Sequence, residues 1–208
     1  MSTHEYISLT REPASDAPLV FAFHGTGGDE HQFFGMAREL VPGAGVITPR
    51  GDVSEMGAAR FFRRTDEGIY DMDDLARATE KLVSFVEAWT TQLGDRPAYG
   101  FGYSNGANIL ASVMMARPDL FDRVGLLHPL IPWEPAPVPA LARTPILITA
   151  GRDDPICPWP LTQRLVDWSE AQGASVVTAY HDGGHELRRE ETAALSQFLR
   201  ASPAEQAA

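Results

Sequence analysis

A serine flanked by two glycines stands where an apolar strand pattern gives way to a helical one. The segment Gly102-Tyr103-Ser104-Asn105-Gly106 follows the run PAYGFGY and precedes ANILASVMMA, so it reads Gly-x-Ser-x-Gly between a strand and a helix. Such a turn is sharp and holds its serine in a strained backbone conformation, where flanking side chains would collide with it. We predict that Ser104 is a nucleophile at a helix N-terminus, and a serine in a plain turn is the alternative.

Two later segments carry the acid and the base that a serine nucleophile requires. In this setting the chain order is serine, then an acid, then histidine. The apolar run PILITA ends shortly before Asp153 and Asp154, and the run SVVTAY ends just before His181-Asp182-Gly183-Gly184-His185. We predict Asp154 as the acid because Pro155 fixes the turn behind it, and Asp153 is the alternative.

The six histidines differ in how well their surroundings suit a catalytic base. His185 follows a Gly-Gly pair that lets its loop fold back over the edge of a sheet, so we predict it as the base. His181 lies closer to its strand and is the alternative. We expect His24 to hold its own loop, His4 to be terminal, and His31 to be solvated at the start of a helix.

A glycine-rich loop after the run VFAFH can offer backbone N–H groups to a developing oxyanion. The loop includes residues 24–30, HGTGGDE, and its glycines let amides point inward without interfering side chains. We predict the backbone amides of Thr26 and Asn105 as the two donors. A phosphate-binding loop is the alternative for this segment, but the Gly-Lys-[Ser/Thr] ending of that motif is missing from it.

Short apolar runs alternate with helical patterns along the chain, which is typical of a mostly parallel sheet with helices on both faces. Strands are predicted over seven ranges: 5–9, 18–24, 45–49, 97–103, 123–128, 144–150 and 174–180. Helices are predicted over 30–41, 71–93, 105–116, 159–172 and 188–201. Because such a sheet binds ligands at the carboxyl ends of its strands, we expect the candidate residues to meet at one edge.

The length, composition and charge of the chain exclude several classes of protein. The 208 residues, 44% hydrophobic and 22% charged, predict a single domain over 1–208, with residues 202–208 as a frayed tail. A formal net charge of −11 argues against nucleic-acid binding. No apolar run reaches the roughly 18 residues that span a bilayer, so no membrane partner is expected. The first residues lack the apolar core of a secretion signal, and we expect a cytoplasmic location.

The strand pattern leaves little room for additional structure around the predicted site. Between the strands 123–128 and 144–150 there is only a proline-rich segment, PLIPWEPAPVPALART, which is too short for a helical cap. We therefore predict an open pocket walled by this segment and by residues 50–70. The single cysteine, Cys157, is expected to be a small buried residue beside the acid loop. No cofactor and no metal ion are predicted.

Four long motifs resemble those of a known family. HGTGGDE, GYSNGAN, GRDDPICP and GGHEL, in this order, are similar to an α/β-hydrolase of the phospholipase/carboxylesterase family. The segments PRGDVSEMGAARFFRRTDEGIYDMDDL and LLHPLIP resemble more closely the bacterial hydrolases encoded near methylhydroquinone- and quinone-resistance genes. The resemblance, from about residue 18 to 200, implies a single-domain α/β-hydrolase fold and a homodimer. It also implies a nucleophile, acid, base and two oxyanion donors: Ser104, Asp154, His185, Thr26 and Asn105.

The segment Arg60-Phe61-Phe62-Arg63-Arg64 contains candidates for substrate binding. Phe61 or Phe62 would line an acyl or aromatic pocket, and Arg63 or Arg64 would receive a substrate carboxylate. The alternatives, which we favour, are burial of the rings in the core and ion pairs with nearby acidic residues. Two further candidates either edge the pocket or only pack: His128 and Trp133.

The sequence therefore predicts a metal-independent serine hydrolase that cleaves small-molecule carboxylic esters through an acyl-enzyme on Ser104. One alternative is an acyl thioesterase or lysophospholipase, and another is a hydrolase for products of aromatic-ring cleavage. A catalytically silent binding protein with the same fold is the non-enzymatic alternative, against which the complete set of candidate residues argues. Dienelactone hydrolases, which place cysteine at the elbow, are excluded by Ser104 itself.

Overall fold

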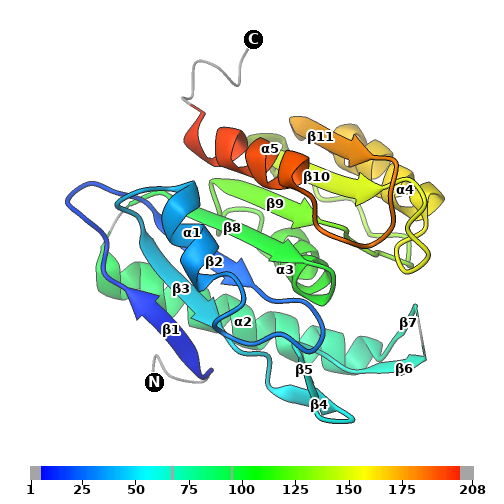
Figure 1. Cartoon of the computed structure of the whole chain (residues 1–208), viewed down its shortest axis with the longest axis horizontal. Helices are drawn as coiled ribbons and strands as arrows, with labels where there is room; N and C mark the ends of the chain where they lie inside the picture. The colour runs from blue at the N-terminus through cyan, green and yellow to red at the C-terminus, as the bar shows by residue number, and fades with distance from the viewer. Residues whose placement is uncertain (1–5, 67, 95, 202–208) are drawn as a thin grey trace.

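A twisted seven-stranded sheet forms the centre of the molecule (Figure 1). The computed structural model describes residues 6–66, 68–94 and 96–201. The strand order is β1-β3-β2-β8-β9-β10-β11, and all neighbouring strands are parallel except β1 and β3. The strands are β1 (Ser8–Arg11), β2 (Leu19–Phe23), β3 (Gly45–Pro49), β8 (Ala98–Tyr103), β9 (Arg123–Leu127), β10 (Ile146–Gly151) and β11 (Val176–His181). The predicted mostly parallel sheet of about seven strands is confirmed.

Helices cover both faces of the sheet, as predicted. They are α1 (Phe34–Leu40), α2 (Met72–Leu93), α3 (Asn105–Ala116), α4 (Trp159–Ala171) and α5 (Arg189–Arg200). One face packs against α1 and α5, and the other packs against α2, α3 and α4 (Figure 1). The strands β2, β3, β9 and β10 are buried along their whole length because helices lie above and below them. This explains their continuous apolar sequences.

Two elements, β1 and α1, begin three or more residues later than the sequence predicted. The edge strand β1 spans Ser8–Arg11, whereas the sequence predicted 5–9. Its bounds follow from its hydrogen bonds with β3 and not from an apolar run. Residue 5 itself lies outside the described residues. Helix α1 begins at Phe34 rather than at residue 30. The Asp29 carboxylate accepts the His31 backbone N–H at 2.9 Å, a local bond that competes with a helical start.

The segment over residues 50–70 contains two short hairpins that the sequence did not reveal as strands. Their strands are β4 (Val53–Glu55) with β5 (Ala58–Arg60), and β6 (Arg64–Asp66) with β7 (Ile69–Tyr70). Met56 and Gly57 both have positive φ angles, 49° and 89°, so the first hairpin turns through two left-handed residues. Strands of two or three residues are too short to show a periodic pattern.

The segment between β9 and β10 folds without a helical cap, as its length predicted. Its backbone is described throughout, and its regular element is a single 3₁₀ helix, η1 (Pro139–Arg143). Within the described parts of the chain, none of the helices combines the length and apolar composition that crossing a bilayer requires. The carboxyl ends of β2, β8, β9, β10 and β11 consequently meet at an edge that no additional helical layer covers.

Candidate active site

Ser104 occupies the sharp turn between β8 and α3. Its φ and ψ angles are 53° and −118°, so a non-glycine residue adopts a left-handed φ, as the motif predicted. A Cβ atom on Gly106 would lie 2.2 Å from the carbonyl oxygen of Phe23, and one on Gly102 would lie 2.4 Å from that of Gly106. Both glycines are required by close backbone packing, and the turn lifts Ser104 above the sheet edge.

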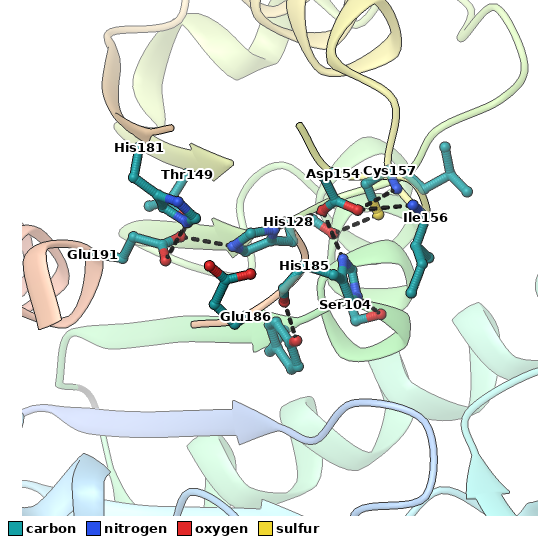
Figure 2. A network of polar contacts seen from close by, with 12 residues as sticks. Ser104, His128, Thr149, Asp154, Ile156, Cys157, His181, His185, Glu186 and Glu191 are labelled. Atoms are coloured by element: carbon teal, nitrogen blue, oxygen red, sulfur yellow. Dashed lines mark hydrogen bonds and ion pairs between the residues drawn. The ribbon is translucent and has the colours of Figure 1, made fainter. Parts of the chain in front are cut away.

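Ser104, His185 and Asp154 come together from three separate loops (Figure 2). The Nε2 atom of His185 lies 2.9 Å from Ser104 Oγ, and its Nδ1 atom lies 2.7 Å from Asp154 Oδ2. If Nδ1 carries the ring proton and donates a hydrogen bond to the Asp154 carboxylate, Nε2 is left to accept a hydrogen bond from the serine hydroxyl. This geometry allows His185 to remove a proton from Ser104.

Asp154 is a buried carboxylate whose two oxygens are fully engaged. Oδ1 accepts the backbone N–H groups of Ile156 at 2.8 Å and Cys157 at 2.9 Å. Oδ2 faces the Nδ1 atoms of both His185 and His128, at 2.7 and 2.8 Å. Burial alone would raise the pKa of Asp154, but these hydrogen bonds outweigh it and lower the pKa below its usual value. The side chain therefore stays ionised beside His185.

The alternative acid and base lie elsewhere. Asp153 is exposed, whereas Asp154 is buried against His185. His181 is buried at the end of β11, and its Nε2 atom lies 3.1 Å from Glu191 rather than near the serine. His24 is also buried, with its Nε2 atom accepting the Gly51 backbone N–H at 2.8 Å. Burial lowers the pKa of His24, which suits a neutral ring that holds the loop.

A cavity of about 280 Å³ opens at Ser104. Among the described residues its lining includes two arginines and no carboxylate, in a chain of net charge −11. The predicted site residues on its wall are Thr26, Arg64, Ser104, Asn105 and His185. The lining residues for which the sequence suggested no substrate role are Arg60, Gly68, Tyr70, Tyr103, Asn108, Leu130, Ile156 and Cys157.

Phe61 and Phe62 do not line this cavity, so the prediction of a pocket role for them is wrong. Both rings are completely buried in the core. The Phe61 ring lies 5.8 Å from that of Phe23, and the Phe62 ring lies 4.8 Å from that of Tyr70. Burying large aromatic surfaces stabilises the fold more than leaving them at a partly wet wall. The alternative that we favoured, ring burial, describes both residues.

Arg63 is likewise not a cavity residue. Its side chain is 59% exposed and lies 3.2 Å from Asp71 and 3.3 Å from Asp74, while its backbone N–H donates to Asp74 at 2.7 Å. Arg63 follows the alternative of an ion pair, because the hairpin turns it toward the start of α2. Its neighbour Arg64 faces the cavity instead.

His128 and Trp133 also lie away from the Ser104 cavity. His128 is completely buried behind Asp154. Trp133 packs against Tyr70 with ring centroids 6.0 Å apart and lines a separate pocket of about 330 Å³. The prediction of a pocket edge is therefore wrong for both residues with respect to this cavity.

Arg60 and Asn108 are functional candidates that the sequence analysis missed. Arg60 is 3% exposed and donates from Nη1 to Thr26 Oγ1 at 2.7 Å. Asn108 donates from Nδ2 to the Tyr70 hydroxyl at 2.7 Å. Asn108 stands four residues after Ser104, so helical spacing places both on one face and was the available signal. Arg60 had no such signal, because its burial results from the hairpin.

The two predicted oxyanion donors border the cavity. The Asn105 side chain accepts the Phe61 backbone N–H at 2.8 Å, and Thr26 Oγ1 accepts from Arg60. Within the part of the chain that the structure describes, no acceptor engages the backbone N–H of Thr26 or Asn105. Asn105 is the first residue of α3, where backbone N–H groups have no partner within the helix. Both amides are thus available to a ligand.

Two groups of three side chains bring metal-ligand atoms within 4.8 Å of one another among the described residues. One contains His128, His181 and Glu191, and the other contains His128, Asp154 and His185. Both carboxylates already accept backbone N–H groups, and the histidine nitrogens face them at ion-pair distance. Attraction between imidazole and carboxylate accounts for both groups. The prediction of no metal stays a prediction.

Comparison with known proteins shows similarity along nearly the entire chain. No family model matches it. The Bacillus subtilis protein MhqD, which bears the name of a hydrolase, is 36% identical over 182 residues, covering 86% of this chain and 91% of MhqD.

Solved structures extend this similarity to the fold. Protein Atu2452 of Agrobacterium tumefaciens is 50% identical, with a TM-score of 0.90 and coverage of 96% of this chain and 98% of that one. A carboxylesterase of Bacillus cereus is 30% identical, with a TM-score of 0.86 and coverage of 93% of each chain. The similarity therefore concerns the whole architecture rather than a single motif.

Proposed function

The chain belongs to the MhqD family of α/β-hydrolases, and from this premise we propose that it is a serine hydrolase that cleaves carboxylic esters. The observation that carries the proposal is the pair of contacts from Ser104 Oγ to His185 Nε2, at 2.9 Å, and from His185 Nδ1 to Asp154, at 2.7 Å. The similarity to a carboxylesterase of Bacillus cereus supports the ester as the bond that is cleaved.

The proposed reaction passes through an acyl-enzyme. His185 takes the hydroxyl proton as Ser104 Oγ attacks the ester carbonyl, and the carbonyl electron pair moves to oxygen. The amides of Thr26 and Asn105 stabilise that oxyanion. The intermediate collapses, and the alcohol leaves with the proton from His185. Water, deprotonated by His185, then attacks the acyl-enzyme, and Ser104 Oγ leaves with the proton from His185 as the acid is released. Asp154 holds the imidazole tautomer and stabilises its charge throughout.

A panel of acyl-chain lengths tests this proposal against the thioesterase and lysophospholipase alternative. We expect kcat/KM to be highest for acetyl and butyryl esters and to fall for octanoyl esters. The reason is that the cavity, about 280 Å³, lies just below the range of roughly 300–1,000 Å³ that is usual for ligand pockets. The measurement is hydrolysis of p-nitrophenyl esters and matched thioesters by the purified protein.

The same experiment separates the remaining alternatives. A preference for octanoyl thioesters would favour an acyl thioesterase. A fluorophosphonate probe that labels Ser104 in the native protein, but not after denaturation, supports an activated serine. An unreactive Ser104, together with no turnover on the panel, would favour a silent binding protein.

A surplus of positive charge in the cavity favours esters that carry an additional carboxylate. Arg60 and Arg64 both line the cavity, and both pair with Glu55, at 3.2 and 2.9 Å. Two guanidinium groups on the wall of the Ser104 cavity thus share the single carboxylate of Glu55. Burial and the neighbouring Arg64 lower the pKa of Arg60, although a guanidinium stays charged in proteins. We infer that a substrate carboxylate is favoured here, which suits products of aromatic-ring cleavage.

Arg64→Gln tests this preference. We expect KM for an ester with a carboxylate at the far end of its acyl chain to rise about tenfold, because a charge-assisted hydrogen bond is lost. KM for the uncharged ester of equal length should stay near the native value. The matched control is Arg63→Gln, which removes the same charge one residue away, outside the cavity. Equal changes for both esters, or equal effects of the two variants, would contradict the proposal.

A further inference from the structure

The oxygen of Asp154 that faces His185 also faces a second histidine. Asp154 Oδ2 lies 2.7 Å from His185 Nδ1 and 2.8 Å from His128 Nδ1. His128 is completely buried, and its other ring nitrogen lies 2.9 Å from Glu191 Oε1 (Figure 2). The polar contacts therefore continue from the serine through Asp154 to a buried carboxylate, whereas the proposed reaction uses only the part that ends at Asp154.

Glu191 is held firmly by the elements around it. It is 1% exposed and is the third residue of α5, where its Oε2 atom accepts the Arg188 backbone N–H at 2.8 Å. The Thr149 hydroxyl donates to Oε1 at 2.5 Å from β10. His181 Nε2, from β11, lies 3.1 Å from Oε2. The position of this carboxylate is therefore set by α5 and by two strands.

His128 lies between two buried carboxylates, and only its protonated form places a positive charge between them. Its Nδ1 atom is within hydrogen-bonding geometry of Asp154, whereas its Nε2 atom lies at ion-pair distance from Glu191 without the alignment of a hydrogen bond. A neutral imidazole carries one N–H and no charge, so it would leave one of the two carboxylates without an oppositely charged or N–H neighbour on this ring. Burial alone would lower the pKa of His128, but Glu191 and Asp154 outweigh it and raise the pKa above its usual value. The residue also has a φ angle of 51°, so the surrounding contacts hold it in a strained backbone conformation.

We propose that His128, kept as an imidazolium by Glu191, is a positioning residue that controls how strongly Asp154 supports His185. This inference rests on the proposed serine hydrolase activity. The His128 and His185 rings are 5.1 Å apart between centroids, so a cation on His128 opposes a second cation on His185. His128 also contacts Asp154 Oδ2, the oxygen that faces His185, and so weakens the attraction between that oxygen and a positive charge on His185.

The other ionisable groups that face this cluster do not change charge near neutral pH. Burial raises the pKa of Tyr103, on β8, to about 12, and its hydroxyl donates to the His185 carbonyl at 2.5 Å. Burial also raises the pKa of the Cys157 thiol, which lies 3.2 Å from the His128 carbonyl. Glu186, before α5, is paired with Arg188 at 2.6 Å, and the pKa of Glu186 is lowered.

Two variants that remove a charge but keep a polar side chain test the proposal. His128→Asn suits the positive φ, keeps an N–H donor for Asp154 and removes the charge. Glu191→Gln keeps an acceptor for its neighbours and removes the charge that holds the proton on His128. In both variants we expect the acidic limb of the kcat/KM profile to move to higher pH by about one unit. The double variant should move no further than either single one, because both act through the same cation.

A structural role would give a different result from a positioning role. If the acidic limb stayed at the native pH while kcat or the melting temperature fell, the pair would only support the fold and the proposal would be overturned. His31→Asn, which alters an exposed histidine that pairs with Glu30 and not with a residue of the cluster, is the control and should leave the profile unchanged. Stoichiometric zinc that is lost on Glu191→Gln would also overturn the proposal.

Nuclear magnetic resonance of the histidine side chains tests the charge without any substrate. We expect two ring N–H signals from His128 in the native protein, both absent in His128→Asn, and a single one in Glu191→Gln. A neutral His128 in the native protein would overturn the inference at any level of activity. If the protein instead hydrolysed no ester while His128 carried two protons, the proposed function would fail and the charged pair would stand.

Discussion

Replacing Ser104 with alanine is expected to lower kcat for ester hydrolysis by about five orders of magnitude while the protein stays folded. The substitution removes the oxygen that would form the acyl-enzyme and the 2.9 Å contact with His185 Nε2. The loss is large because the variant has no side-chain hydroxyl at this position for His185 to activate. Residual activity should come from the oxyanion donors and from substrate binding alone.

The control for this variant is a second serine on the same helix. Ser112→Ala removes a hydroxyl that contacts Thr79 at 2.7 Å, so its kcat should stay close to the native value. Both proteins are compared by circular dichroism and by steady-state kinetics. Retained turnover in Ser104→Ala would assign the reaction to another group, and the Cys157 thiol is one such candidate on the cavity wall. Burial raises the pKa of that thiol, which argues against it.

Asp154→Asn is expected to lower kcat by about four orders of magnitude. One carboxylate oxygen accepts two backbone N–H groups and the other faces two histidine N–H groups. In one orientation the NH₂ group of the asparagine amide would face the two backbone N–H groups, and in the other it would face the two histidine N–H groups. A donor would meet two donors in either case. The least costly response is for His185 to take the opposite tautomer, which places a proton on Nε2 and leaves Ser104 without a base.

The same variant should change how stability depends on pH. Folding lowers the pKa of Asp154, so its ionised form stabilises the native state above the ordinary pKa, and this contribution is lost as the pH falls through the lowered value. At neutral pH we expect the free energy of unfolding to fall by about 3 kcal/mol, because His128 loses a buried partner. Urea unfolding at several pH values measures this, and the loss relative to the native protein should shrink in acid.

Asp153→Asn is the matched control for the acid. Asp153 is the adjacent carboxylate and is exposed, so we expect its replacement to change neither kcat nor the free energy of unfolding appreciably. If Asp153→Asn instead abolished activity and Asp154→Asn did not, the assignment of the acid would be reversed. The two variants therefore separate the acid from its neighbour in the chain.

The fold was largely predictable from local patterns. Strands such as β3 (Gly45–Pro49) and helices such as α3 (Asn105–Ala116) have the predicted bounds, because burial on two faces or on one stripe leaves a clear hydrophobic period. The hairpins between residues 53 and 70 were not predictable in this way. Their strands are too short for a period, and the Met56-Gly57 turn lacks the usual asparagine or aspartate signal.

The orientation of the residues on the substrate side of the cavity was likewise not predictable from local patterns. The five residues Arg60 to Arg64 read as one candidate segment, yet the structure buries Phe61 and Phe62, turns Arg63 to α2 and leaves Arg60 and Arg64 at the cavity. Which side each residue faces depends on the register of two hairpins. That register is decided by packing against the sheet and against α2, which no local pattern records.

The sequence by itself determined the chemistry that is available and its order at the ends of the strands. Ser104 between glycines, Asp154 and His185 follow β8, β10 and β11 because a parallel sheet brings the carboxyl ends of its strands to one edge. Only the tertiary structure decided that His128 faces Asp154 and that Glu191 faces His128. Those contacts join residues that lie far apart in the chain. The packed strands and the start of α5 exclude water from these side chains, and a buried charge is stable only when it is paired with an opposite charge.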